Sequence, residues 1–122
     1  MNTKLADSIS IYMNSINSND SSVLGTCIAK DAHIHDVGEN KHINGLEAIK
    51  KWRGGSNDEF KLKSEVTAVE EKYGITIVTS IVSGNFPSSP HIFYYFFTIA
   101  DDLITNIEII PGEENIDIGH DQ

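Results

Sequence analysis

The spacing of apolar residues changes along the chain from a helical period to a strand period, and this change limits the possible folds most strongly. In the first half, apolar residues such as Leu5, Ile9 and Ile16 recur every three or four positions, which is typical of amphipathic helices. From Phe60 onward, β-branched and aromatic residues alternate with polar ones, which favours strands. Helices and strands that are segregated along a chain pack as layers of an α+β fold. We therefore expect three N-terminal helices packed on a curved antiparallel sheet.

Three helices are predicted before residue 60. The first begins near residue 2 or 3, and the second is short, follows a cap at residues 19–20, and uses Val23, Leu24, Cys27 and Ile28 as its apolar face. A short strand over residues 31–36 and a turn over residues 37–41 precede the third helix. Asn44 and Glu47 form a capping box for that helix, Lys50, Lys51 and Arg53 suit its C-terminal dipole, and Gly54-Gly55 ends it.

Four strands are predicted in the second half, joined as a meander. They cover residues 60–72, 75–82, 91–99 and 103–110. Two prolines predict a loop over residues 84–90, since proline cannot donate to a strand ladder. The acidic segment 111–122 is predicted to be a frayed, flexible tail or a flap over the sheet.

Length and charge exclude several classes of protein. With 122 residues the chain fits one domain, residues 1–122. A net charge of −9 repels phosphate backbones and anionic membranes, so we expect no nucleic-acid or membrane partner. The N-terminal segment lacks the features of a secretory signal, which predicts a cytoplasmic protein. Cys27 is the single cysteine, so no internal disulfide can form, and its apolar neighbours predict a buried thiol.

Four segments, in this order and spacing, resemble the NTF2-like superfamily and within it the SnoaL-like polyketide cyclases and the ketosteroid isomerases. They are Asn17–Asp20, Lys30–Asp36, Gly45–Ile49 with Trp52, and Ser83–Pro87. The resemblance covers nearly the whole chain. It implies a cone-shaped fold with an apolar pocket between the helices and the concave side of the sheet.

The likeness to ketosteroid isomerases implies roles for individual residues. Their oxyanion tyrosine falls on Tyr12 and their general-base aspartate on Asp36, whereas their second oxyanion donor, a protonated aspartic acid, falls on Tyr94 or Tyr95. This chain therefore departs from the isomerases at the second donor, although a tyrosine hydroxyl also donates hydrogen bonds.

The residues themselves leave alternatives open. A carboxylate at the mouth of an apolar pocket can serve as a base near neutral pH, but Asp36 could equally be a turn residue that binds backbone amides. Tyr12 lies on a core stripe and could simply be packed there, and His35 could orient a carboxylate or a polar substrate group. The aromatic residues that could line a substrate pocket are equally typical of a core; they are Trp52, Phe86, Tyr95 and Phe97.

No cofactor motif is present in the sequence, and we expect neither a cofactor nor a metal. A metal site would have to use His33 and His35 with His91 or Glu108. Our main hypothesis is a pocket protein that transfers a proton on a hydrophobic carbonyl compound, with Asp36 as base and Tyr12 as donor to the enolate. The alternative is a non-catalytic ligand-binding or dimerisation module of the same superfamily.

A homodimer is expected to form through the outer face of the sheet. Apolar residues on strands that are already packed on one side would leave a larger apolar surface than a monomer usually exposes. The residues assigned to this outer face by their parity are Val78, Val82, Tyr94, Ile104 and Ile110.

Overall fold

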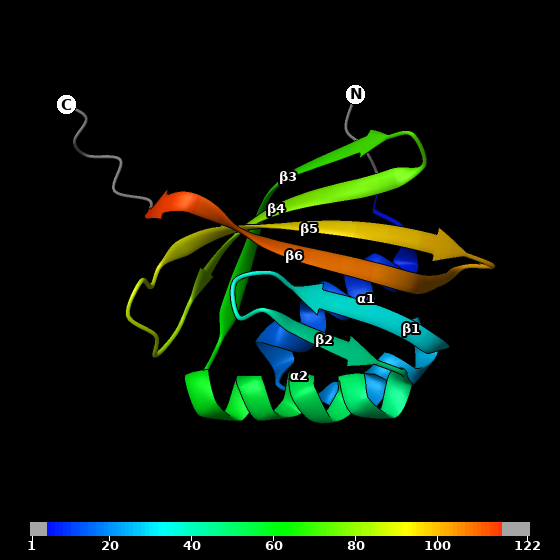
Figure 1. The fold of residues 1–122 in the computed structure, drawn as a ribbon, viewed down its shortest axis with the longest axis horizontal. Coiled ribbons are helices and arrows are strands. Elements are labelled where there is room, and N and C mark those ends of the chain that lie inside the picture. The colour runs from blue at the N-terminus through cyan, green and yellow to red at the C-terminus, as the bar shows by residue number, and fades with distance from the viewer. Residues whose placement is uncertain (1–4, 116–122) are drawn as a thin grey trace.

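The computed structural model describes residues 5–115, which form two α-helices, one 3₁₀ helix and six strands (Figure 1). The helices are α1 (Asp7–Ser18), η1 (Ser21–Thr26) and α2 (Leu46–Phe60). The strands are β1 (Ile28–Asp36), β2 (Lys41–Asn44), β3 (Lys63–Lys72), β4 (Ile75–Ser83), β5 (His91–Ala100) and β6 (Leu103–Asn115). The α+β class and the expected order of helices before a meander are confirmed. None of the helices in residues 5–115 is long and apolar enough to cross a membrane.

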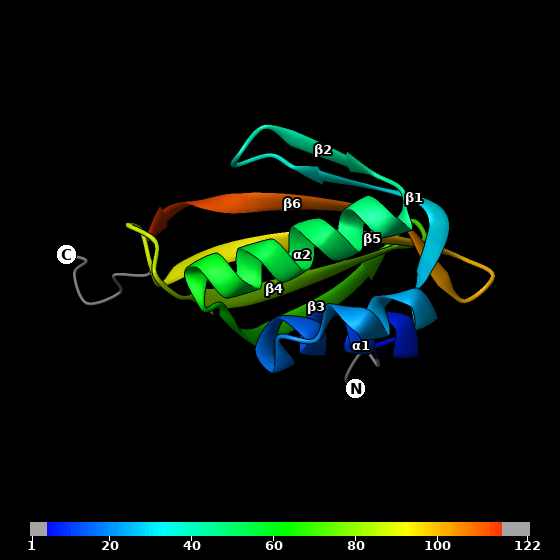
Figure 2. The same cartoon turned by 90° about the horizontal axis from the view of Figure 1, so that it is seen from below.

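All six strands belong to one sheet in the order β2-β1-β6-β5-β4-β3. The predicted antiparallel meander from β3 to β6 is present, but the sheet is mixed because β1 pairs with β6 in parallel. Register shifts interrupt the β1–β6, β3–β4 and β5–β6 ladders. Such irregularities bend and twist strands, and the sheet curves around the helices (Figure 2).

The helices cover the concave side of this sheet. Helix α2 packs on β1 and β2, whereas α1 packs on β3 and β6. The core between the layers consists of side chains from both helices and from the inner face of the strands, with Ile9, Ile16, Ile34, Ile49, Phe97 and Ile107 fully buried. Cys27 is buried in the same cluster, as predicted, and burial raises the pKa of its thiol to about 11.

Helix α2 differs from the prediction at both ends. Its N-cap is Gly45, whose φ of 92° lies in the region that favours glycine, and no side chain caps it; Asn44 belongs to β2 instead. The predicted end at Gly54-Gly55 is wrong, because the helix continues to Phe60 and ends where Lys61 takes a left-handed conformation. A Cβ on Gly54 would lie 3.2 Å from the Ser21 hydroxyl oxygen, so a small residue allows η1 to pack closely here.

Other helices and strands also begin or end at residues that differ from the prediction. The second helix is a 3₁₀ helix that ends before Cys27, and Ile28 already starts β1, so the predicted strand over 31–36 is longer than expected. Residues 41–44, expected to be partly turn, form β2. Strand β6 runs to Asn115, so residues 111–115 are not an irregular tail, and residues 116–122 lie outside the described part. The start predicted for the first helix lies outside it too.

The outer face of the sheet was predicted only in part. Tyr94 and Ile110 are register partners on the side away from the helices, as expected. Val78, Val82 and Ile104 instead face the core and are almost fully buried. Their parity was misjudged because strand periodicity gives two alternating sets of side chains without saying which set faces inward.

Candidate functional site

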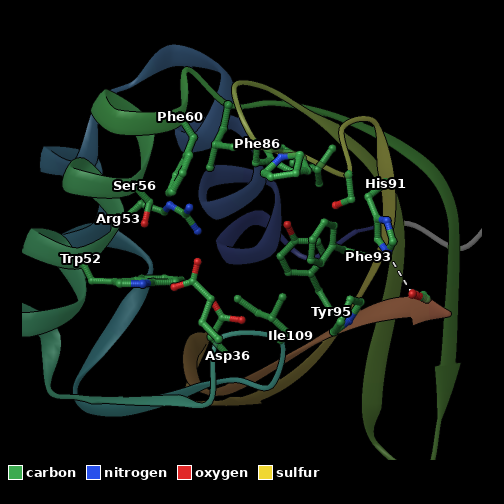
Figure 3. A pocket seen from close by; sticks show the side chains of 18 residues that line it. Asp36, Trp52, Arg53, Ser56, Phe60, Phe86, His91, Phe93, Tyr95 and Ile109 are labelled. Carbon is green, nitrogen blue, oxygen red and sulfur yellow. Dashed lines mark hydrogen bonds between the residues drawn. The ribbon is translucent and has the colours of Figure 1, made fainter. Parts of the chain in front are cut away.

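A cavity of about 480 Å³ lies between α2, the end of β1 and the inner face of β5 and β6 (Figure 3). Apolar and aromatic side chains make up most of its lining. The polar and charged side chains among the lining residues are Asp36, Glu39, Arg53, Ser56, Ser88, His91 and Tyr95. This is the combination of an apolar cavity with a few polar groups that is typical of small-molecule sites.

One side of the cavity is a face of α2. Trp52, Ser56 and Phe60 recur at helical spacing along this face and line the cavity together with Arg53. Ser56 and Phe60 reach the cavity only because α2 continues past the two glycines that were predicted to end it. The unexpected length of α2 therefore builds part of the site.

The loop between β4 and β5 closes another side with Phe86, Pro87 and Ser88. This loop is held against the end of α2, where the Asn85 backbone N–H donates to the Phe60 carbonyl at 2.7 Å. A Cβ on Gly84 would lie 2.5 Å from the same carbonyl oxygen, so only glycine permits this approach. The predicted substrate-binding residue Phe86 is positioned at the cavity by this contact.

Asp36 ends β1 and directs its carboxyl group into the cavity, toward Trp52 and Arg53 (Figure 3). Burial raises the pKa of this carboxyl above its ordinary value, and the Glu39 carboxylate raises it further. The Glu39 backbone N–H, Arg53 and Lys41 act in the opposite direction without cancelling the effect. A carboxyl group with a raised pKa in an apolar cavity is a candidate for proton transfer.

Arg53 is the residue that the sequence analysis missed as part of a site. The side chain is only 4% exposed, its guanidinium lies 4.4 Å from the Trp52 ring centroid, and it points into the cavity (Figure 3). Its Nη1 donates to the Tyr12 hydroxyl oxygen at 2.9 Å. In the sequence, Arg53 comes shortly after two lysines, a pattern typical of a solvent-exposed helix end. The one signal for a site was its position next to Trp52 and on the helix face that carries Ile49.

Tyr12 is not one of the lining residues. It is fully buried, its ring packs edge-on against Tyr95 and Phe97, and its hydroxyl accepts the hydrogen bond from Arg53. The expectation that Tyr12 donates directly to a substrate oxygen is therefore wrong for this arrangement, because α1 places the residue behind the cavity wall. The structure favours the packing alternative for this residue.

Tyr95, unlike Tyr12, lines the cavity. It lines the wall on β5 and projects toward the cavity interior (Figure 3), and burial raises the pKa of its hydroxyl. The hydroxyl therefore stays protonated, and no hydrogen-bond partner for it is found within residues 5–115. Phe97, two residues further along the same face, is fully buried in the core and does not line the cavity, contrary to expectation.

His35 lies on the outer face of the sheet, because neighbouring strand residues point to opposite sides and Asp36 points inward. Its Nδ1 donates to the Glu108 carboxylate at 3.0 Å, and its ring stacks on His42. His35 therefore orients a carboxylate, one of its two expected roles, but it does not line the cavity and cannot orient a substrate group there. His33 shares a hydrogen bond with His42 at 2.9 Å, but within residues 5–115 no three His, Cys, Asp or Glu side chains are arranged to hold a metal ion.

Solved structures resemble this chain along most of its length. A protein from Sinorhizobium meliloti, named as a candidate polyketide cyclase, shares 30% sequence identity with a TM-score of 0.79, over 86% of this chain and 94% of its own. The chain belongs to the family of this candidate polyketide cyclase. No family model and no curated protein sequence matches it.

More distant structures share the fold of this polyketide cyclase-like protein. One is a ketosteroid isomerase-like protein from Catenulispora acidiphila in complex with trimethylamine, with 14% identity, a TM-score of 0.76, and coverage of 87% and 85% of the two chains. Another is an NTF2-like protein of unknown function from Cytophaga hutchinsonii, with 12% identity, a TM-score of 0.72, and coverage of 92% and 95%. Since one fold hosts many activities, function must be argued from the cavity.

Proposed function

We propose that the protein binds a hydrophobic carbonyl compound in this cavity and that Asp36 transfers a proton at the carbon next to the carbonyl. The observation that carries the proposal is a carboxyl group with a raised pKa on the wall of a largely apolar cavity. A base whose pKa is closer to the working pH is a better proton acceptor and donor. The apolar and aromatic walls favour a substrate with a hydrophobic body.

The reaction begins with Asp36 ionised. Its carboxylate removes the proton from the α-carbon, the C–H electron pair forms a C=C bond, and the carbonyl π electrons move to the oxygen. Tyr95 is the group we assign to donate a hydrogen bond to this developing enolate oxygen, a role that its protonated hydroxyl can fill. In a conjugated enolate, return of the proton from Asp36 to the γ-carbon would complete an isomerisation. Attack of the enolate carbon on a second carbonyl group, whose oxygen takes the proton from Asp36, would complete a cyclisation.

Deuterium exchange tests this proposal without knowledge of the natural substrate. In D₂O, the protein should accelerate exchange of the α-protons of 4-phenylbutan-2-one well above the rate in buffer, as followed by ¹H NMR. A hydrophobic ketone that binds without faster exchange would contradict the proposed chemistry. Mass spectrometry of a co-purified hydrophobic compound would then identify the natural ligand.

The second candidate function is a ligand-binding module without chemistry. The position of Tyr12 favours it, because the two residues matched to the ketosteroid isomerase site do not both line the cavity. Binding of the ketone with no exchange of its α-protons is the result expected for such a module.

We also propose that the protein forms a homodimer through the outer face of the sheet. This face over β4, β5 and β6 carries half-buried apolar side chains beside Thr79, Thr98 and Glu108. The apolar ones include Ile77, Ile81, Ile92, Tyr94, Phe96 and Ile110. A contiguous apolar face of this kind is a common site of association, and a two-fold axis would pair it with itself.

The substitution Tyr94→Asp should convert the dimer to a monomer, because it places a charge in the middle of the apolar face. Sedimentation equilibrium at micromolar concentration would measure the change in mass. Tyr73→Asp is the matched control, since Tyr73 is completely exposed at the turn between β3 and β4, and it should remain dimeric. A wild-type protein that sediments as a monomer would contradict the proposal.

A further inference from the structure

Within residues 5–115, the guanidinium of Arg53 is buried without an ionic partner. Only 4% of the residue is exposed, and the ion pairs among the described residues involve other side chains. Transfer of a charge from water into a protein interior is costly unless an opposite charge or several hydrogen bonds stabilise it. Arg53 therefore lies in a place where a counter-ion would be strongly favoured.

Most of the hydrogen-bonding capacity of Arg53 is also unused. A guanidinium carries five N–H donors, and the one hydrogen bond found for it within residues 5–115 goes to the neutral Tyr12 hydroxyl. In the described part of the chain, its Nε and the Nε1 of the preceding Trp52 are both buried and find no hydrogen-bond partner. Because Arg53 lines the cavity, its remaining N–H donors indicate a place for a ligand acceptor.

Asp36 does not supply this acceptor. Its carboxyl group and the guanidinium both point into the cavity (Figure 3), but they form no ion pair within the described chain, and the pKa of Asp36 is raised despite Arg53. A direct ion pair with Arg53 would be expected to lower that pKa. Both groups line the cavity, so the guanidinium is available to an acceptor on a ligand there.

We propose that the ligand carries a carboxylate that pairs with Arg53, so that the substrate class is a hydrophobic keto acid. A planar guanidinium matches a carboxylate with two parallel hydrogen bonds, which gives both affinity and orientation. The aromatic wall formed by Trp52, Phe93 and Tyr95 holds the hydrophobic body. Arg53 thereby determines which end of the molecule faces α2. This inference rests on the proposed function for the ketone, but the recognition of the carboxylate requires no chemistry.

Titration calorimetry with 4-oxo-4-phenylbutanoate and its methyl ester tests the inference, because the two probes share the ketone and the ring and differ in charge. We expect the wild-type protein to bind the acid about 10- to 100-fold more tightly than the ester, the range for a hydrogen bond to a charged group. In Arg53→Met this preference should disappear, whereas the affinity for the ester should change little. Equal affinities in the wild-type protein, or a preference that survives in Arg53→Met, would overturn the proposal.

Two further variants keep the test decisive. Arg53→Lys retains the positive charge, so it should keep part of the preference for the acid even if the Met variant does not fold. Asp36→Asn should bind the acid at least as tightly as the wild type, because it removes a carboxyl group that faces the same space. Loss of proton exchange in Asp36→Asn with the acid preference intact would support both proposals. An acid preference without any exchange in the wild type would refute only the proposed chemistry.

Discussion

Replacement of Asp36 by asparagine should lower the rate of α-proton exchange by about 10²- to 10⁴-fold, the usual contribution of a general base. Asparagine has nearly the same shape but cannot accept the proton, so the affinity for the ketone should be almost unchanged. NMR exchange rates at saturating ketone, together with titration calorimetry, would separate the two effects. An unchanged rate in Asp36→Asn would refute the assignment of Asp36 as the base.

The pH profile gives a second signature of Asp36. Only the ionised carboxylate can remove the proton, so the exchange rate should rise with pH through the raised pKa of Asp36 and then level off. Glu39→Gln is the matched control, because Glu39 also lines the cavity and its carboxylate helps to raise that pKa. This variant should remain active, and its profile should shift to lower pH.

The same pKa shift predicts an effect on stability. Folding raises the pKa of this carboxyl group, so the folded state favours its protonated form. Its contribution to the free energy of unfolding is therefore complete below the unfolded pKa of 3.8 and is lost as the pH rises through the folded pKa. At pH 7, Asp36→Asn should therefore be at least as stable as the wild type toward urea. Near pH 3 the two proteins should unfold at similar urea concentrations.

Truncation of Tyr12 to alanine should lower the free energy of unfolding by about 3–5 kcal/mol, the range for a large aromatic residue removed from a core. The ring is fully buried between α1 and β5, in contact with Tyr95 and Phe97. Tyr12→Phe keeps the ring but removes the acceptor for Arg53, and it should cost about 1–3 kcal/mol. Urea unfolding followed by circular dichroism would measure both changes.

The exchange assay decides whether Tyr12 has a role beyond packing. Because its hydroxyl lies behind the cavity wall, Tyr12→Phe should retain most of the exchange activity, in contrast to Asp36→Asn. Tyr73→Ala is the control for stability, since this exposed side chain should contribute no more than about 0.5 kcal/mol. A Tyr12→Phe protein that folds normally but loses exchange as fully as Asp36→Asn would restore Tyr12 as the oxyanion donor.

Some parts of the site could be predicted from the sequence because they depend on local order. Asp36 was found because it ends an alternating segment just before a turn, and Trp52 because it shares a helical face with Ile49. Phe86 and Tyr95 were named as aromatic residues of a predicted loop and strand that could line a pocket. For Asp36 and Trp52, the position along an element was enough to place the side chain near the pocket.

Other parts depend on what covers each residue in space. Tyr95 and Phe97 lie on the same face of β5, yet one lines the cavity and the other is core, because different neighbours cover them. Arg53 lies in a run with two lysines that is typical of an exposed helix end, and only the packing of α2 over the sheet buries it. No local pattern in the sequence distinguishes these cases.

The sequence by itself determined the α+β class, the order of helices before strands and the antiparallel meander, because hydrophobic periods and turn residues act over a few neighbouring positions. Only the tertiary structure decided the parallel pairing of β1 with β6, the continuation of α2 past Gly54-Gly55 and the outward position of His35. Each of these outcomes depends on contacts between residues far apart along the chain. Such contacts can outweigh the local cost of glycine in a helix, about 1 kcal/mol, and they select which face of a strand is buried.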